Sequence, residues 1–378
     1  MLPALKTDRP RLADVLASSL ASIAGDDNIL GLPMVRKAIV VLVDGLGAAA
    51  LQSRAGHART LAGRLGPASI IESGFPTTTA AALASLATGL PAGQHGLVGY
   101  SVLDEANDRV VNQLSGWDTL IDPIEWQSQP TIFEKAAARG FDAVVIGPAR
   151  YKGSGFSTAV LRGARYLPAA TIAERFQVAE SWAREPGNGI AYLYIPELDQ
   201  TGHASGWQSP AWTDWLEQVD SAVRAVEPVL GKGTGLIVTA DHGVIDVPAS
   251  SHVLVDELPG LLDGVRFVAG EPRCLQLHFD TALDAAAREA LVAEWHASED
   301  SRSWVATRAE AISAGWFGVV DPAVESRIGD LIVAARKDIA YYDGRAKNQS
   351  GRKMIGQHGS WSPAELRIPL LRFGAFAR

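Results

Sequence analysis

The feature that most restricts the fold is an apolar run at residues 38–43 that stops abruptly at Asp44-Gly45. Short, fully apolar runs rich in β-branched residues are typical of parallel strands buried on both faces of a sheet. Helical segments separate this run from three similar ones, at residues 141–147, 190–196 and 235–241. The alternation predicts an α/β fold with a doubly wound, mostly parallel sheet flanked by helices.

The helical segments are recognised by the spacing of their apolar residues. Within residues 210–230, Leu216, Val219, Val223 and Val226 recur at the three- and four-residue intervals of one helix face. Further helices are predicted at residues 11–25, 77–89, 131–140 and 171–182, and a further strand at residues 68–74.

After about residue 252 the pattern changes. Residues 271–279 and 303–312 are predicted to be strands around a helix at 282–299, and the core is expected to resume at 327–335. A chain of 378 residues is long enough for one large domain with a smaller inserted one. We therefore predict a core of residues 1–254 and 326–378 with a small α+β insert, or lid, at residues 255–325.

Charge and composition narrow the possible partners. The chain has 34 basic and 42 acidic residues, a net charge of −8, which argues against nucleic acid or an anionic membrane as partner. A small anionic substrate is compatible with this charge, because bound divalent cations would reverse the local field. No stretch approaches the ~20 consecutive apolar residues that cross a bilayer. No secretion signal is recognisable either, so a cytoplasmic location is expected.

Several residues able to carry chemistry share one placement. Asp44, Asp199, Asp241 and Thr79 each lie at or just past the carboxyl end of a predicted strand, or at the start of the next helix. In open α/β sheets, ligands bind at that edge, where positions far apart in the sequence converge. These side chains are therefore expected to lie close together.

Each carboxylate and histidine also has a structural interpretation. Asp44, taken alone, is more typical of a helix cap or turn than of a metal ligand. Asp199 and His203, four residues apart, would share one helix face within reach of one cation, or would be a helix-starting Asp and a surface His. The adjacent Asp241 and His242 favour a ligand pair, because both groups cost desolvation at the end of an apolar strand. His358, a single His between glycine-flanked turns, is by itself more typical of a hydrogen-bonded loop residue.

Three consecutive threonines precede the helix at 77–89. Any of them could be its N-cap. The first turn of a helix also offers unpaired N–H groups and a positive dipole end to a phosphoryl oxygen. A threonine hydroxyl there is a weak nucleophile that needs activation, which a bound metal can supply.

The order Asp, Thr, Asp-x-x-x-His, Asp-His and His resembles the alkaline phosphatase superfamily, and more narrowly its nucleotide pyrophosphatase/phosphodiesterase branch. The resemblance covers roughly residues 37–252 and 327–373. Its motifs occur here as Asp44-Gly45, Phe75-Pro76-Thr77-Thr78-Thr79, Thr88-Gly89 with His95-Gly96, Asp199 to His203, Asp241-His242-Gly243 and His358-Gly359.

The resemblance implies an alkaline phosphatase-like fold and a hydrolase with two divalent metal ions. Zinc fits the ligands best, and manganese or iron would also be accepted. By this match, Asp199, His203 and His358 hold one ion, and Asp44, Asp241, His242 and the Thr79 oxygen hold the other. Thr79 is the nucleophile that forms a covalent phosphothreonine intermediate; its choice over Thr77 and Thr78 rests on the family match.

Two departures from the family concern substrate contacts. Ala81-Ala82 stand where the branch commonly has Pro-Asn, and Tyr100 stands where it often has an Asn that holds a phosphoryl oxygen. Tyr100 could donate its phenol to the substrate instead, or pack in the core. The expected partner is a small phosphate ester or nucleotide.

Other functions remain open at this point. A phosphomonoesterase, phosphonate hydrolase or phosphomutase could use the same scaffold, and a metal-binding protein without catalysis is a further alternative. A sulfatase is disfavoured, because Cys274 lacks the setting of the modified residue that sulfatases need.

Overall fold

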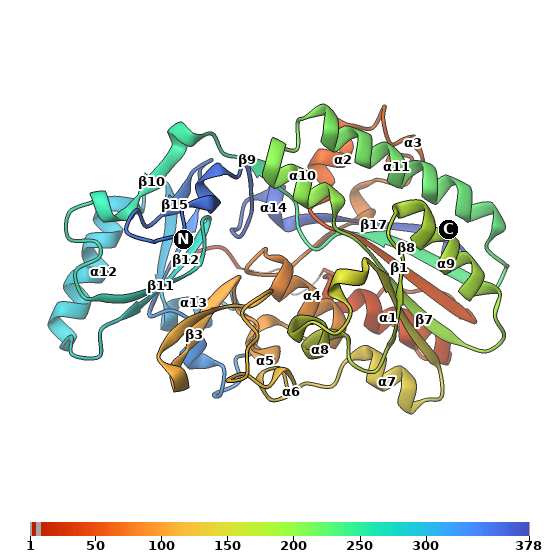
Figure 1. Ribbon diagram of the computed structural model, residues 1–378, viewed down its shortest axis with the longest axis horizontal. Helices are drawn as coiled ribbons and strands as arrows, with labels where there is room; N and C mark the ends of the chain where they lie inside the picture. Colours follow the sequence, from red (N-terminus) through yellow and green to blue (C-terminus); the bar gives the residue numbers. More distant parts are fainter. Residues whose placement is uncertain (1, 5–8, 378) are drawn as a thin grey trace.

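The computed structural model describes residues 2–4 and 9–377. Its central element is a seven-stranded sheet in the order β2-β17-β8-β1-β7-β5-β6 (Figure 1). Within this sheet, β17 is antiparallel to both of its neighbours and the other pairings are parallel. The strands are β1 (Lys37–Val43), β2 (Ile70–Glu72), β5 (Asp142–Gly147), β6 (Arg165–Pro168), β7 (Gly189–Ile195), β8 (Thr234–Thr239) and β17 (Arg367–Gly374). The predicted fold class, an α/β fold with a mostly parallel sheet, is confirmed.

Helices cover both faces of this sheet (Figure 1). One face carries α1 (Ala13–Ala24), α4 (Thr79–Thr88), α7 (Ile132–Ala138) and α8 (Gly155–Leu161). The other carries α2 (Ala48–Ser53), α3 (Arg59–Ala62), α9 (Ile172–Arg184), α10 (Glu197–Ser205) and α11 (Pro210–Val226). Three further short helices, α5 (Ala92–His95), α6 (Pro123–Trp126) and α14 (Pro363–Leu366), lie in the connections.

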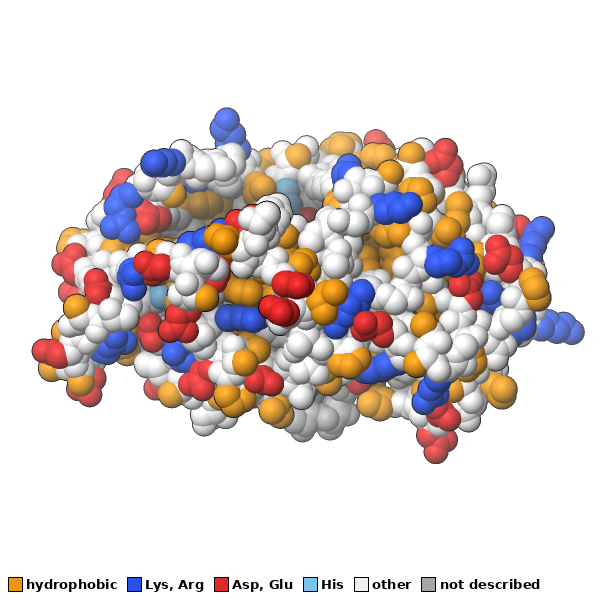
Figure 2. All heavy atoms as spheres, turned by 60° about the horizontal axis from the view of Figure 1, so that its bottom comes forward, with side chains coloured by type: hydrophobic (Ala, Val, Ile, Leu, Met, Phe, Trp, Pro, Cys, Tyr) orange, Lys and Arg blue, Asp and Glu red, His pale blue; other side chains and the backbone are white. Residues whose placement is uncertain are grey.

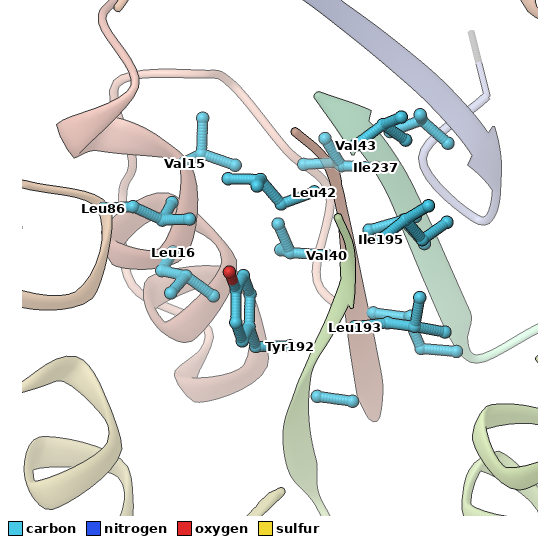
Figure 3. Close-up of a cluster of buried hydrophobic side chains, with 14 of the residues drawn as sticks. Val15, Leu16, Val40, Leu42, Val43, Leu86, Tyr192, Leu193, Ile195 and Ile237 are labelled. Carbon is cyan, nitrogen blue, oxygen red and sulfur yellow. The ribbon is translucent and has the colours of Figure 1, made fainter. Parts of the chain in front are cut away.

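The main core is built on the central strands β1 and β7. All seven residues of β1 are buried, which the uninterrupted apolar run predicts for residues 38–43. Side chains alternate between the two faces of the sheet: Val40 and Leu42 point toward α1, whereas Leu193 and Ile195 point toward the opposite face (Figure 3). Burial of both faces fixes the register of these strands, and so fixes where each strand ends.

A smaller, four-stranded antiparallel sheet lies at the other end of the molecule (Figure 1). Its strands, in the order β11-β12-β14-β13, are β11 (Val265–Glu271), β12 (Cys274–Phe279), β14 (Leu331–Ala335) and β13 (Ser303–Thr307). The helix α12 (Ala285–Glu299) packs on it through the buried Leu291 and Trp295.

Two expectations about this region are wrong. The strand predicted at 303–312 ends at Thr307, where α13 (Arg308–Ser313) begins. Thr307 accepts a hydrogen bond from the Glu310 N–H, and Glu310 accepts one from the Thr307 N–H, so a capping box starts a helix here. The core does not resume at 327–335, because β14 pairs with β12 and β13 in the smaller sheet. The insert boundary predicted at residue 325 thus precedes a strand of the smaller sheet, and the chain returns to the large sheet only at β17.

Three two-stranded ladders connect these parts. They are β3 (Ser101–Asp104) with β4 (Arg109–Asn112), β9 (Ile245–Asp246) with β16 (Gly356–Gln357), and β10 (His252–Leu254) with β15 (Ala340–Tyr342). The second ladder brings the segment before His358 beside the segment after His242.

The surface charge and the character of the helices bear on possible partners. On the face shown in Figure 2, acidic and basic side chains are interspersed and do not form a continuous basic patch. In the described ranges, 2–4 and 9–377, no helix combines the length and the apolar character needed to span a bilayer.

The packing of β7 yields a stability prediction. Leu193 is fully buried in the main core, so Leu193→Ala leaves a cavity and should lower the free energy of unfolding by ~2–5 kcal/mol. Leu120→Ala is the matched control, because Leu120 is 59% exposed and its truncation should change stability by less than about 0.5 kcal/mol. Equilibrium denaturation with urea measures both. Equal losses in the two variants would contradict this account of the core.

Candidate functional site

The candidate residues gather at one edge of the large sheet. Asp44 directly follows β1, Asp199 lies in the first turn of α10 after β7, and Asp241 lies two residues beyond β8. Because β8, β1 and β7 are neighbours in the sheet, their parallel ends bring three carboxylates together. All three are at most 8% exposed. The spatial convergence that the sequence predicted is therefore observed.

Like charges crowd this edge. Burial, followed by the charges of Asp241 and Asp199, raises the pKa of Asp44 well above its usual value. Asp241 accepts hydrogen bonds at its Oδ1 from the N–H groups of Gly45 (3.1 Å) and His242 (3.0 Å). Three carboxylate oxygens, Asp44 Oδ1, Asp199 Oδ1 and Asp241 Oδ2, are buried and accept no hydrogen bond from the described residues.

Three histidines face these carboxylates. His242 Nε2 lies 3.6 Å from Asp44 Oδ1 and 3.4 Å from Asp241 Oδ2. On the other side of the site, Asp199 lies 3.2 Å from His203 Nε2 through Oδ2 and 3.9 Å from His358 Nε2 through Oδ1. Burial is the largest effect and lowers the pKa of His203, but the Asp199 charge and the hydrogen bonds to Asp199 and the Gly356 carbonyl together outweigh it and raise that pKa to about 9.

Backbone carbonyls orient all three imidazoles. The Nδ1 of His203 donates to the Gly356 carbonyl (2.7 Å), that of His358 to the Thr77 carbonyl (2.8 Å), and that of His242 to the Gly243 carbonyl (3.3 Å). A carbonyl can only accept, so each Nδ1 carries a hydrogen, and in the neutral form of each ring the Nε2 lone pair points into the site. Bonds of this kind fix the tautomer and ring orientation of a metal-binding histidine.

The residues present fit two divalent cations. Ligand atoms of Asp44, Asp241 and His242 lie within 4.8 Å of one another, and so do those of Asp199, His242 and His358. Buried oxygens without hydrogen bonds, opposed by imidazole nitrogens, are the ligands that zinc and similar ions take. His203 joins the second set through its contact with Asp199, whereas His242 lies between the two sets.

Thr79 is the first residue of α4, and Thr78 is the N-cap. The Thr79 hydroxyl lies 3.1 Å from His242 Nε2. Thr77 has a different contact: its hydroxyl donates to the Ser360 carbonyl (2.7 Å). The structure thus separates the three threonines, because Thr79 alone of them has a recorded hydroxyl contact with a candidate ligand among the described residues.

Tyr100, the predicted substrate contact, is 39% exposed and lies just before β3. Its neighbour Ser101 donates a hydrogen bond to the Gly270 carbonyl in the smaller sheet (2.8 Å). Tyr100 is therefore not a core residue, and it lies where the two parts of the molecule meet.

Two residues near the site were not identified from the sequence. Tyr194 donates a hydrogen bond to Asp44 Oδ2, and its position at the end of the strand that precedes Asp199 was the available signal. Glu271 lies in the smaller sheet, and its side chain packs on Gly359, beside His358: a Cβ added at Gly359 would lie 2.5 Å from Glu271 Cγ. No local pattern marks Glu271, because the contact depends on how the two sheets are placed.

Burial raises the pKa of Glu271 to about 8; the nearby Thr78 hydroxyl opposes this shift and the Glu365 charge adds to it. The carboxyl group of Glu271 is therefore mostly neutral at pH 7 in the folded protein. It lies near Thr78, the residue before Thr79.

Comparisons with known proteins identify a family and a fold. The family model described as type I phosphodiesterase/nucleotide pyrophosphatase matches residues 38–361. A search of curated proteins finds no match.

Solved structures similar to this chain include murine and human ectonucleotide pyrophosphatase/phosphodiesterase 5. The murine structure has a TM-score of 0.67 at 18% identity and covers 89% of this chain and 88% of its own. The human structure has a TM-score of 0.66 at 18% identity, with the same coverage. An inactive threonine-to-alanine form of the murine protein in complex with AMP has a TM-score of 0.66 at 17% identity, covering 90% of this chain and 88% of its own. At this identity the likeness establishes the fold.

The raised pKa of Glu271 yields a pH-dependent prediction. Between pH 4.5 and about 8 the unfolded chain ionises Glu271 while the folded protein keeps it protonated, so the unfolded state binds fewer protons and stability falls as pH rises. Glu271→Gln abolishes this loss. The free energy of unfolding of Glu271→Gln, relative to that of the wild type, should therefore increase as pH rises through this window, by up to ~1.4 kcal/mol per pH unit.

The measurement is denaturant unfolding of both proteins at pH 5 and pH 8. The exposed Glu125, replaced in the same way, is the control and should show no such trend. A difference between Glu271→Gln and wild type that is the same at both pH values would contradict the burial argument.

Proposed function

The chain belongs to the type I phosphodiesterase/nucleotide pyrophosphatase family, and from this premise we propose that it hydrolyses phosphodiester or pyrophosphate bonds through a covalent intermediate on Thr79. The family is metal-dependent and consists of hydrolases. The observation that carries the proposal is the position of the Thr79 hydroxyl, at the start of α4 and 3.1 Å from His242 Nε2, beside two sets of candidate ligands.

The residues that would hold the two metal ions divide into two sets. Asp44, Asp241, His242 and the Thr79 oxygen would hold one ion. Asp199, His203 and His358 would hold the other. Bound cations of this kind neutralise phosphoryl oxygens and favour the deprotonated form of a hydroxyl nucleophile. Zinc is the proposed metal, because the ligands are carboxylates and imidazoles in small numbers.

The chain itself positions the nucleophile and the phosphoryl group. Thr78 is in an extended conformation as N-cap, so Thr79 begins the helix and the N–H groups of the first turn of α4 have no partner within the helix. These groups and the positive end of the helix dipole would bind phosphoryl oxygens. A hydroxyl fixed at this point is preorganised for in-line attack on phosphorus, which removes much of the entropic cost of bringing the two together.

Two displacements complete the proposed reaction. In the first, the Thr79 hydroxyl releases its proton to solvent and the bond from Thr79 Oγ1 to phosphorus forms. The bond from phosphorus to the leaving-group oxygen breaks, and that oxygen leaves with the electron pair. In the second, water attacks phosphorus and loses a proton, while the Thr79 oxygen leaves with the electron pair and takes up a proton, which regenerates the hydroxyl. Tyr100, at the junction of the two parts of the molecule, would contact the substrate through its phenol.

The solved relatives support the same assignment. The inactive murine form carries a threonine-to-alanine substitution and is in complex with AMP. A nucleotide is accordingly the proposed substrate class for this chain, with small phosphate diesters as the wider group.

The nucleophile assignment predicts the behaviour of Thr79→Ala. The variant should lose turnover by on the order of 10³-fold or more, because the attacking atom is gone, while it keeps at least six of the seven proposed ligand residues. Activity on bis(p-nitrophenyl) phosphate and metal content by elemental analysis measure the two effects.

Thr88→Ala is the matched control, since Thr88 is a buried threonine at the other end of α4. It should retain turnover. A fully active Thr79→Ala enzyme would show that another residue attacks phosphorus.

Metal removal and substrate choice test the reaction class. The wild-type enzyme should cleave bis(p-nitrophenyl) phosphate faster than p-nitrophenyl phosphate, should lose this activity with a chelator, and should regain it with zinc. A preference for the monoester would indicate a phosphomonoesterase instead. Turnover that survives complete metal removal would refute the two-metal assignment.

A further inference from the structure

A hairpin of the smaller sheet makes a buried ion pair with the segment after His358. Arg273 lies in the turn between β11 and β12, and Glu365 lies in α14, next to β17 of the large sheet. Arg273 Nε donates to Glu365 Oε1 and Arg273 Nη2 to Glu365 Oε2, both at 2.8 Å. Neither side chain is exposed to solvent. This two-pronged contact joins the two parts of the molecule.

The remaining donors of Arg273 are also used. Its Nη1 donates to the carbonyls of Lys337 (2.9 Å) and Ile339 (2.7 Å), and its Nη2 also to that of Ala335 (3.3 Å). All five guanidinium N–H groups thus have acceptors, which is the condition under which a buried arginine is tolerated. Lysine could not make this planar set of contacts.

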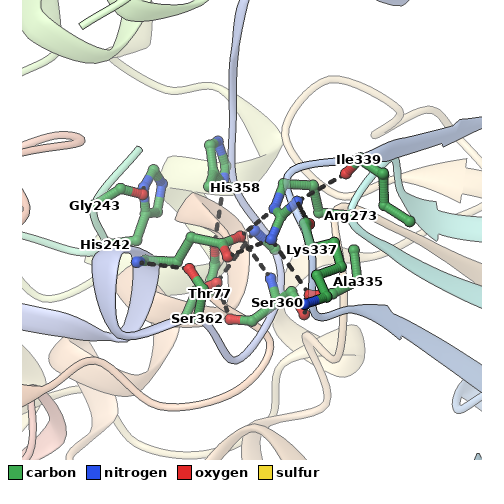
Figure 4. A network of polar contacts seen from close by, with 12 residues as sticks. Thr77, His242, Gly243, Arg273, Ala335, Lys337, Ile339, His358, Ser360 and Ser362 are labelled. Atoms are coloured by element: carbon green, nitrogen blue, oxygen red, sulfur yellow. Dashed lines mark hydrogen bonds and ion pairs between the residues drawn. The ribbon is translucent and has the colours of Figure 1, made fainter. Parts of the chain in front are cut away.

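Glu365 also contacts the segment that carries His358. Figure 4 shows Arg273, Ser360, Thr77 and His358 close together in this region. Glu365 Oε1 accepts from the Ser360 N–H (3.0 Å), and the Ser360 carbonyl accepts from the Thr77 hydroxyl (2.7 Å). The Thr77 hydroxyl also accepts from the Gly359 N–H (3.1 Å), and the Thr77 carbonyl accepts from His358 Nδ1 (2.8 Å). A continuous set of hydrogen bonds therefore runs from Arg273 to the imidazole of His358 and to a residue two positions before Thr79.

Two further contacts place Glu365 between the candidate ligands. The backbone carbonyl of Glu365 accepts from the N–H of Gly243, which directly follows His242 (2.8 Å). From the hairpin itself, Glu271 packs on Gly359, so the hairpin contacts this loop with two of its residues. The loop that presents His358 is thus fixed from the smaller sheet.

We propose that Arg273 is a positioning residue for the reaction. Through its contacts with Glu365, Ser360 and Thr77, it holds His358 and the start of α4, which carries Thr79, in the relative positions that the reaction needs. This inference rests on the proposed function. It means that the smaller sheet supplies part of the catalytic framework in addition to any contact with the leaving group.

The test uses the full-length enzyme and variants that remove this set of contacts at two points. Arg273→Met combined with Glu365→Met removes both charges together, which avoids leaving either one buried and unpaired. Thr77→Val removes the hydroxyl and keeps the size and branching of the side chain. The third protein carries all three substitutions. The control is Arg302→Met with Glu299→Met, an Arg–Glu pair of the same smaller sheet region whose side chains make no recorded contact with residues 358–365.

Four quantities are measured for each protein: kcat and KM on bis(p-nitrophenyl) phosphate, the unfolding temperature, and zinc affinity by competition with a chromogenic chelator. We expect the Arg273/Glu365 variant and Thr77→Val each to lose about 10- to 100-fold in kcat, with KM within about twofold, because a small misplacement of reacting groups has effects of this size. Zinc affinity should fall about 10-fold, as for the loss of a residue that orients a ligand. The control pair should keep kcat and zinc affinity even if its unfolding temperature falls.

The variant with all three substitutions decides whether the residues act as one set. If they do, its kcat should resemble that of the weaker of its two parents, because the same arrangement is lost in both. Losses that multiply, or a kcat loss no greater than that of the control pair, would overturn the proposal.

Two further outcomes can also be interpreted. If the Arg273/Glu365 variant does not fold, Arg273→Lys replaces it, and wild-type kcat and zinc affinity in that protein would overturn the proposal. If the wild-type enzyme does not cleave the diester, the proposed function fails; zinc affinity still tests Arg273, and an unchanged value in the variants would overturn the positioning role separately.

Discussion

The structure depends on the cost of placing three carboxylates side by side in a buried position. Asp44, Asp199 and Asp241 converge because the order β8-β1-β7 makes their strand ends adjacent. Hydrogen bonds from two backbone N–H groups satisfy only Asp241 Oδ1, and one oxygen of each carboxylate is left without a hydrogen bond from the described residues. Such an arrangement is unfavourable unless positive charge is close by, because desolvated like charges repel strongly. The histidines and the proposed cations would supply this positive charge.

The site is assembled from segments that lie far apart in the sequence. The carboxylates lie on strand ends or in the helix turn after them, whose positions the packed core fixes. His203 lies one turn beyond Asp199, but His242 and His358 lie on loops, where the backbone could vary. Their orientation is set by carbonyl acceptors, and for His358 that acceptor is the backbone of Thr77. The segment that leads to Thr79 and the loop that carries His358 are therefore fixed against each other, so neither can move without disturbing the other.

The sequence was most informative where chemistry and local pattern coincide. Strands were predicted for β1, β2, β5, β7 and β8 of the large sheet, but not for β6 or β17. Because parallel strands end at one edge, the convergence of Asp44, Asp199 and Asp241 followed without knowledge of strand order. The family match chose Thr79 among three threonines that local reasoning could not separate. The strand at 331–335 was assigned to the wrong sheet, because an apolar run carries no information about which partner it pairs with. Glu271, Arg273 and Glu365 were missed for the same reason: their contacts join residues some 90 positions apart.

The position of the smaller sheet in the chain gives these missed residues their importance. Its strands are inserted between β10 and β17, so the polypeptide leaves the large sheet before His358 and returns to it directly afterwards. A loop placed in this way has the smaller sheet on one side and α14 on the other. The ion pair of Arg273 with Glu365 lies at this crossing, fully enclosed, and it ties the hairpin end of the smaller sheet to the helix that precedes β17. Because that end is fixed, the hairpin and the loop that carries His358 keep one relative position, and the proposed catalytic geometry depends on it.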